Sequence, residues 1–198
     1  MGIFINISRI VEVVTRINGW VDGLDLETLI DYAGRVNNGI IFEIGTASGR
    51  SAATLAIASS TSKIYTLDNY EDWYYRNPQT MLLSKYQENN KRDVLRSWKW
   101  VDDVLQTDIL QRITHIIDDS RTYEWTGPKF DLLFIDGNHA YKFVKNDYER
   151  FIPYVKKGGV VIMDDYTREE GNGYCVKKYL DEIGADVKGI GNLAIIQL

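Results

Sequence analysis

The chain of 198 residues contains one cysteine, Cys175, so it cannot form a disulfide bond within itself. That composition fits a reducing compartment, and we expect a cytoplasmic protein. No apolar run approaches the length of a membrane span, and the N-terminus lacks the basic start and long apolar block of a signal peptide. The sequence therefore predicts a protein without a membrane segment.

Positive charge is also in short supply. The chain has 23 lysines and arginines against 28 aspartates and glutamates, which gives a formal net charge of −5. Proteins that neutralise many phosphates usually carry a basic excess, so the charge balance disfavours a nucleic-acid partner. We find no internal repeat and no low-complexity linker, and the length suits one domain with a full core.

Short apolar runs alternate with segments of helical periodicity from residue 39 onward. Runs of this kind are typical of strands that are buried on both faces. We predict a Rossmann-like, doubly wound α/β fold: a mostly parallel seven-stranded sheet with an antiparallel last strand and helices on both faces. The predicted strands are 40–45, 63–68, 113–118, 130–136, 159–165, 185–190 and 192–198, and the predicted helical segments are 49–60, 77–90, 97–111, 141–155 and 174–184.

Residues 1–38 are predicted to form a helical extension ahead of the domain at 39–198. The extension is expected in two pieces, broken at 18–25, with Asp25 as the N-cap of the second helix.

Acidic residues stand at the ends of the predicted parallel strands. In open α/β sheets, ligands bind beyond the carboxyl ends of the strands, so these side chains mark the expected site. A strand-end Asp also often only caps the next turn, and this alternative stays open for each one. The residues are Glu43, Asp68, Asp118 or Asp119, Asp136, and Asp164 with Asp165.

The segment EIGTASGRS at 43–51 is a glycine-bearing turn between a strand and a helix. Gly45 and Gly49 would let the backbone approach a ligand, but the spacing lacks the first pair of the G-x-G-x-x-G dinucleotide fingerprint. Asp68, about twenty residues further on, could accept both hydroxyls of a ribose. Asp119 is our favoured acceptor for an adenine amino group.

Several motifs, in order, resemble class I S-adenosylmethionine-dependent methyltransferases. They are IFEIGTASGRSAATLA, IYTLDNY, IIDDS, FDLLFIDGNHAY and IPYVKKGGVVIMDDY, and the resemblance covers 39–198. It is closest to the small O-methyltransferases of catechol and macrocin type, and IDGNHAY with GGVVIMDDY is its most specific part. The resemblance implies Glu43, Gly45 and Ser51 on the methionine and ribose side, Asp68 on the ribose and Asp119 with Ser120 at the adenine. Thr46, Gly49, Asn69 and Asp136 complete the predicted cofactor contacts.

Three acids close the fourth and fifth predicted strands, and they would repel one another unless a cation joined them. Oxygen ligands suit Mg²⁺, and we carry the metal-binding role of the resembled enzymes to Asp136, Asp164 and Asp165. His139 is the candidate base for the acceptor hydroxyl, with Asp136 beside it. Sugar-modifying relatives often have an acid where this chain has Asn138, and an amide cannot act as the base. The alternatives are that Asp136 works without metal and that His139 only caps or packs.

The segment 69–100 is rich in aromatic residues and longer than most connections. It could form a lid or stacking wall, a dimer contact or ordinary core, and the sequence leaves these open, together with a homodimer. We therefore expect an enzyme that methylates a hydroxyl of a small molecule, phenolic or on a sugar. The rivals are a metal-free methyltransferase acting on a macromolecule, a nicotinamide-binding oxidoreductase and a cofactor-binding protein without catalysis.

Overall fold

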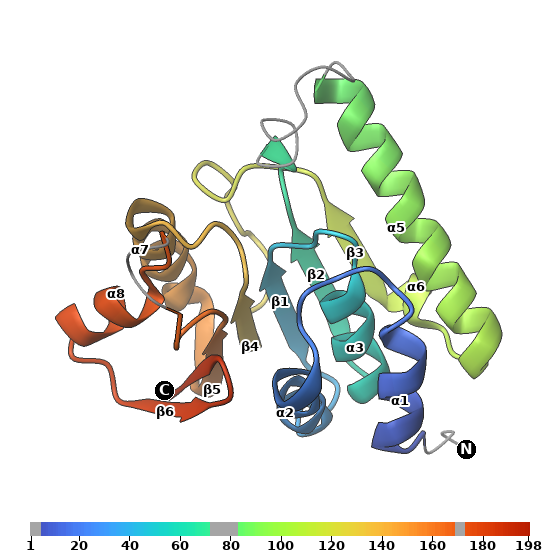
Figure 1. The fold of residues 1–198 in the computed structure, drawn as a ribbon, viewed down its shortest axis with the longest axis horizontal. Coiled ribbons are helices and arrows are strands. Elements are labelled where there is room, and N and C mark those ends of the chain that lie inside the picture. Colours follow the sequence, from blue (N-terminus) through green and yellow to red (C-terminus); the bar gives the residue numbers. More distant parts are fainter. Residues whose placement is uncertain (1–4, 72–82, 169–172) are drawn as a thin grey trace.

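The computed structural model describes residues 5–71, 83–168 and 173–198. Seven strands form one sheet in the order β3-β2-β1-β4-β5-β7-β6 (Figure 1). This order reverses direction between β1 and β4, which creates a topological switch point at the centre of the sheet. The strands are β1 (Ile40–Ile44), β2 (Lys63–Leu67), β3 (Ile113–Ile116), β4 (Phe130–Ile135), β5 (Val155–Met163), β6 (Val187–Ile190) and β7 (Leu193–Gln197).

Strand directions confirm the predicted mixed sheet. β1 pairs in parallel with β2 and with β4, β2 pairs in parallel with β3, and β4 with β5. β7 runs antiparallel to β5 and to β6, so the chain ends in a hairpin whose last strand inserts beside β5. Five parallel strands therefore end at the same edge, where their following loops meet.

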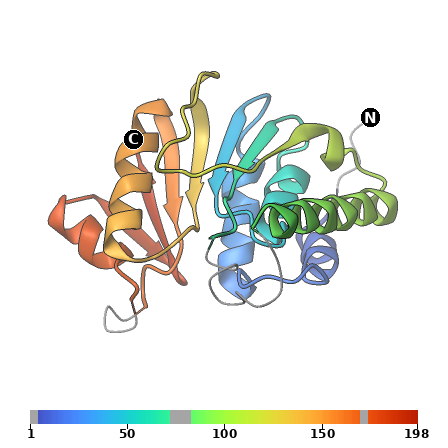
Figure 2. The same ribbon diagram turned by 90° about the horizontal axis from the view of Figure 1, so that it is seen from above.

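Helices cover both faces of the sheet, and each face has its own hydrophobic core (Figures 1 and 2). Successive residues of β1 point to opposite faces, so Ile41 belongs to one core and Phe42 to the other. One face is packed by α1 (Ile7–Val14), α2 (Gly23–Gly34), α3 (Arg50–Ala58), α5 (Leu83–Leu105) and α6 (Ile109–Arg112), and the other by α7 (Tyr141–Phe151), the short 3₁₀ helix Ile152–Tyr154 and α8 (Val176–Glu182).

The N-terminal helices pack directly on the sheet domain. Val14 of α1 and Leu26 of α2 are completely buried in the same core as Leu55 of α3. The prediction of two helices before residue 39 is therefore confirmed, while the domain boundary at residue 38 stays a prediction. Asp25 was the wrong N-cap, because the helix begins earlier with Asp22 at the cap position and Asp25 in its first turn.

The connection between β2 and β3 differs from the prediction. Two helices were expected at 77–90 and 97–111, but α5 is one continuous helix through 105, followed by the single turn of α6. Residues 89–99 lack a helix breaker, and local propensity therefore lets the helix continue. The aromatic residues at 73–75 lie outside the described residues. Trp98 is fully buried, and its indole N–H donates to Gly49 O at 2.8 Å. For Trp98 the core-packing alternative is correct.

Candidate active site

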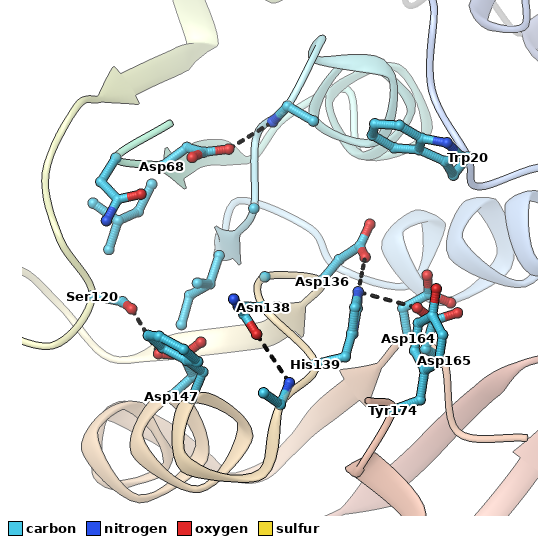
Figure 3. A pocket seen from close by; sticks show the side chains of 18 of the residues that line it. Trp20, Asp68, Ser120, Asp136, Asn138, His139, Asp147, Asp164, Asp165 and Tyr174 are labelled. Atoms are coloured by element: carbon cyan, nitrogen blue, oxygen red, sulfur yellow. Dashed lines mark hydrogen bonds and ion pairs between the residues drawn. The ribbon is translucent and has the colours of Figure 1, made fainter. Parts of the chain in front are cut away.

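A cavity of about 850 Å³ lies at the carboxyl ends of the parallel strands (Figure 3). Its size suits a cofactor together with a small substrate. Sequence prediction had named many of its lining residues: Gly45, Asp68, Asn69, Asp118, Asp119, Ser120, Asp136, Asn138, His139, Asp164 and Asp165. The position beyond the strand ends agrees with the expectation for an open α/β sheet.

Close backbone approach explains the glycines of the β1–α3 loop. Gly45 has φ +104°, and a Cβ there would lie 2.0 Å from Asp136 O, so only glycine fits between the ends of β1 and β4. Gly49 has φ +84° and precedes the first residue of α3. Gly45 and Ala47 line the cavity, whereas Gly49 does not: a Cβ at Gly49 would lie 2.7 Å from the Trp98 indole nitrogen.

Asp68 at the end of β2 braces this loop. Its Oδ2 accepts a hydrogen bond from Ala47 N at 2.8 Å, and its Oδ1 accepts one from Tyr70 N at 2.7 Å (Figure 3). Asn69 follows and accepts from Glu71 N at 3.0 Å through its side chain. The two backbone donors hold the Asp68 carboxylate at the cavity wall.

Glu43 lies beneath the loop instead of at the cavity rim. It is completely buried and does not line the cavity. Thr66 donates to its carboxylate, and Thr46 hydrogen bonds to Thr66 at 2.6 Å. Burial raises the pKa of Glu43 to about 7, against opposing hydrogen bonds from Thr66 and Ser51. Glu43, Thr46 and Ser51 thus form a polar support under the loop.

The end of β3 carries a more exposed arrangement. Asp119 pairs with Arg121, and this pairing lowers the Asp119 pKa below its ordinary value. Ser120 Oγ donates instead to Asp147 Oδ1 at 2.7 Å (Figure 3). Asp147 comes from α7, is 2% exposed and lines the cavity, yet in the sequence it resembles any surface charge of an amphipathic helix.

Asp136 and Asp164 form a carboxyl pair where β4 and β5 end. Burial raises the pKa of both groups, and their proximity raises the pKa of Asp136 further. Neighbouring carboxylates repel when both are ionised, so this pair favours a shared proton.

Asp165 is engaged with different partners. Its Oδ1 lies 2.5 Å from Arg168 Nε and 2.8 Å from Asn192 Nδ2. Its Oδ2 lies 3.1 Å from His139 Nε2. The second acid of the Asp164–Asp165 pair therefore has a structural reason to be there, which the sequence did not indicate.

His139 stands between the two acidic groups. Its Nε2 is 3.9 Å from Asp136 Oδ1 and closer to Asp165, and its ring lies 5.5 Å from the ring of Tyr174 (Figure 3). Asn138 uses its side-chain oxygen to accept from Ala140 N at 3.0 Å. Asn138 therefore shapes the turn that presents His139 to the cavity.

Asp136, His139, Asp164 and Asp165 together form what we call the acidic corner of the cavity. Its ligand atoms suit a hard cation only in part. Oxygens of Asp136 and Asp164 are the type of ligand that Mg²⁺ prefers. Asp165 would have to exchange its present partners to join them. Within the described ranges, no three His, Cys, Asp or Glu side chains are grouped so that they could hold a metal ion. Magnesium binding stays a prediction.

Sequence analysis missed the wall opposite the strand ends. Trp20 and Asp22, from the segment between α1 and α2, line the cavity, as do Arg168 and Tyr174 from the segment after β5. Figure 3 shows Trp20 across the cavity from Tyr174. No motif marks any of the four residues, and Trp20 and Asp22 reach the site only because α1 and α2 pack on the sheet.

Comparison with known proteins agrees with this geometry. A family model described as a methyltransferase domain matches residues 42–166, which is more than half of the chain. An uncharacterized protein of Acanthamoeba polyphaga mimivirus is 53% identical over 36 residues, which are 18% of this chain and 16% of that protein. That curated relative is therefore matched over about a sixth of its length.

Solved structures share the fold at low sequence identity. An O-methyltransferase from Bacillus cereus in complex with S-adenosylhomocysteine has a TM-score of 0.59 and 18% identity, and the match covers 99% of this chain and 93% of that chain. TomG, an O-methyltransferase of tomaymycin synthesis from Streptomyces achromogenes in complex with S-adenosylmethionine, gives 0.60 and 15%, with 96% and 88% covered. CalS11, a TDP-rhamnose 3′-O-methyltransferase of calicheamicin biosynthesis, gives 0.60 and 16%, with 97% and 81% covered.

Among the described residues, no helix combines the length and the apolar character needed to cross a membrane.

Proposed function

The chain belongs to the family of methyltransferase domains, and we propose that it transfers a methyl group from S-adenosylmethionine to a hydroxyl oxygen of a small molecule. The observation that carries the proposal is the cavity in which the glycine loop, Asp68 and the acid–histidine corner face one space. The fold is shared with O-methyltransferases whose structures hold S-adenosylmethionine or S-adenosylhomocysteine.

The cofactor would lie along the ends of β1, β2 and β3. Asp68 would accept hydrogen bonds from the ribose hydroxyls, and the backbone at Gly45 would leave room for the adjoining part of the molecule. Ser120 and Asp119 would border the adenine. When bound, S-adenosylmethionine supplies an electrophilic methyl group on a sulfonium, so the protein has only to align the acceptor and remove its proton.

His139 is our proposed base. Nε2 lies 3.1 Å from Asp165 Oδ2, so a proton held on Nε2 would leave Nδ1 as the basic nitrogen of the neutral ring. The acceptor oxygen would form its bond to carbon as its proton passes to His139, and S-adenosylhomocysteine would be released as a neutral thioether. Asp165 would stabilise the imidazolium that results, as a carboxylate does beside other catalytic histidines.

The proposal also includes a divalent cation, bound at the acidic corner in addition to S-adenosylmethionine. Asp136, Asp164 and Asp165 would supply the carboxylate oxygens, with Asp165 leaving one of its present partners. A bound Mg²⁺ would lower the pKa of the acceptor hydroxyl. The acceptor class, a phenol or a sugar, rests on the resemblance and on the exposed ring of Trp20 at the cavity, since both kinds of ring stack on indole.

Calorimetric titration of S-adenosylhomocysteine tests the first half of the proposal, and Mg²⁺ titration into the loaded protein tests the second. We expect the wild-type protein to bind S-adenosylhomocysteine. Asp186→Ala, which changes an exposed loop residue outside the cavity, should bind it equally well and is the control for Asp68→Ala. Mass spectrometry of a panel of catechols and sugars incubated with S-adenosylmethionine would then detect the gain of one CH₂, the net result of replacing a hydroxyl hydrogen with a methyl group. Absence of S-adenosylhomocysteine binding by folded protein would overturn the proposed function.

A further inference from the structure

The turn between β6 and β7 reaches the acidic corner through one side chain. Asn192 donates from Nδ2 to Asp165 Oδ1 at 2.8 Å. Its Oδ1 accepts from Thr167 N at 3.1 Å and from Thr167 Oγ1 at 2.5 Å. Its backbone oxygen accepts from Tyr166 N at 2.8 Å. Asn192 therefore holds three consecutive residues of the segment that follows β5.

Asp165 needs such support. Its φ is +58°, in the left-handed region that a residue with a Cβ rarely adopts. This conformation turns its carboxylate back toward His139. Arg168 also binds the carboxylate, but its side chain is 53% exposed, whereas the Asn192 amide is fixed by hydrogen bonds on every side.

The N-terminal extension completes the arrangement. Asp25 of α2 accepts from Asn192 N at 2.8 Å, across 167 positions of sequence. Gly191 has φ +58°, and a Cβ there would lie 2.1 Å from Asp25 Oδ1, so glycine at residue 191 lets the Asp25 carboxylate keep its bond to Asn192 N. A chain of contacts thus runs from α2 through Asn192 and Asp165 to His139.

We propose that Asn192 is a positioning residue for methyl transfer: its side-chain amide holds Asp165 in the orientation that aligns the His139 imidazole, and Asp25 of α2 holds Asn192. That His139 acts as the base rests on the proposed function. The contacts by which Asn192 and Asp165 orient its imidazole do not. A hairpin turn needs only its backbone for β6–β7 pairing. The side chain of Asn192 instead hydrogen bonds to Asp165 and Thr167 in the segment after β5, as expected of a residue that positions a neighbouring group.

The two histidines of the chain make the alignment directly measurable. Imidazole ¹⁵N–¹H correlation spectra at one fixed pH report His139 at the site and His115 elsewhere, where Tyr70 Oη lies 3.0 Å from His115 Nε2. In Asn192→Ala we expect the His139 signals to shift or broaden and those of His115 to keep their positions. Thr167→Val is the matched control, because it removes a bond to Asn192 Oδ1 and leaves the Nδ2 bond to Asp165 intact.

A second variant keeps the test decisive if Asn192→Ala does not fold. Asn192→Asp keeps an acceptor for Thr167 but replaces the donor to Asp165 with a like charge, so it should disturb His139 at least as strongly. Unchanged His139 signals in a folded Asn192 variant would overturn the positioning role. Equal disturbance by Thr167→Val would also overturn it, because the turn as a whole would then be responsible.

Kinetics with an acceptor from the panel give a second readout. We expect Asn192→Ala to lower kcat by about ten- to a hundredfold, as a small misplacement of a catalytic group does, with KM for S-adenosylmethionine within twofold of wild type. In a His139→Gln background the same substitution should have no further effect. Retained S-adenosylhomocysteine binding with an unaffected kcat would overturn this inference alone, whereas lost binding in the wild type would overturn the proposed function.

Discussion

Glu43→Gln is the substitution for which the structure gives the clearest energetic expectation. Glu43 is completely buried in β1, and burial raises its pKa from an ordinary 4.5 to about 7. The difference between these two values corresponds to about 3 kcal/mol of differential stability. Glutamine has nearly the same shape and can still accept the hydrogen bond from Thr66, but it does not ionise.

The sign of the pH dependence follows from the raised pKa. Between pH 4.5 and 7 the folded protein keeps a proton on Glu43 that the unfolded chain has lost. The contribution of this group is therefore fully present below pH 4.5 and is lost as pH rises through 7. Relative to wild type, the Gln variant should gain up to about 3 kcal/mol of unfolding free energy between pH 5 and pH 8.

Urea unfolding of both proteins at pH 5, 6, 7 and 8 would measure this difference, in which the titration of groups that do not interact with Glu43 cancels. Glu27→Gln, an exposed glutamate of α2, is the control and should show no such trend. A difference that stays flat with pH, or that favours the wild type at pH 8, would refute the assignment of a raised pKa. The same variant should keep its affinity for S-adenosylhomocysteine within about tenfold, because Glu43 does not line the cavity. Complete loss of S-adenosylhomocysteine binding would instead support the direct contact between Glu43 and the cofactor that the family resemblance implies.

Four further substitutions test the site and the core around it. Asp68→Ala should weaken S-adenosylhomocysteine binding by about tenfold or more in calorimetry, because the loop loses its brace and the ribose its acceptor. Asp164→Asn should bind S-adenosylhomocysteine nearly as well as wild type does. An equal loss of affinity in both variants would contradict our assignment of Asp68 to the cofactor end of the cavity and Asp164 to the acceptor end. His115 has a pKa lowered to about 4 by burial, so its contribution of up to about 3 kcal/mol is present above pH 6.5 and is lost as pH falls through 4. His115→Phe should flatten the acid limb of a stability profile followed by circular dichroism, and an unchanged limb would rule this out. Trp98→Phe removes the indole donor to Gly49 O and should lower the unfolding free energy by about 1–3 kcal/mol in urea titration, with weaker cofactor binding as a second sign.

The local sequence pattern predicted much of the scaffold. Five apolar runs with a following acid predicted parallel strands ending at one edge, and the cavity lies there with Asp68, Asp136 and Asp164 in its lining. The glycine-bearing turn after β1 was predicted, and the positive φ of Gly45 with the close approach of Asp136 O gives the structural reason for glycine there, while its predicted contact with a ligand stays a prediction. These features depend on residues near one another in sequence or on the regular rules of α/β sheets.

Other predictions depended on how far along its strand a side chain lies. Glu43 lies inside β1 and pairs with Thr66, whereas Asp68 follows the last residue of β2, two positions beyond Thr66. Glu43 is therefore buried beneath the loop and Asp68 lies at the cavity, although the apolar runs alone suggested equivalent positions. The predicted break between 90 and 97 was likewise wrong, since α5 continues to Leu105.

The sequence by itself determined the order of strands and helices, the glycine loop and the acids at the strand ends, because short-range periodicity and turn chemistry govern them. Only the tertiary structure decided that Asp165 serves His139, that Ser120 binds Asp147 and that Asn192 joins Asp25 of α2 to the site. Those contacts link segments that are 26 to 167 positions apart, where no repeating pattern connects the partners. Folding brings them together through the burial of the apolar faces of α2, α7 and β7, and the polar partners are placed by that packing.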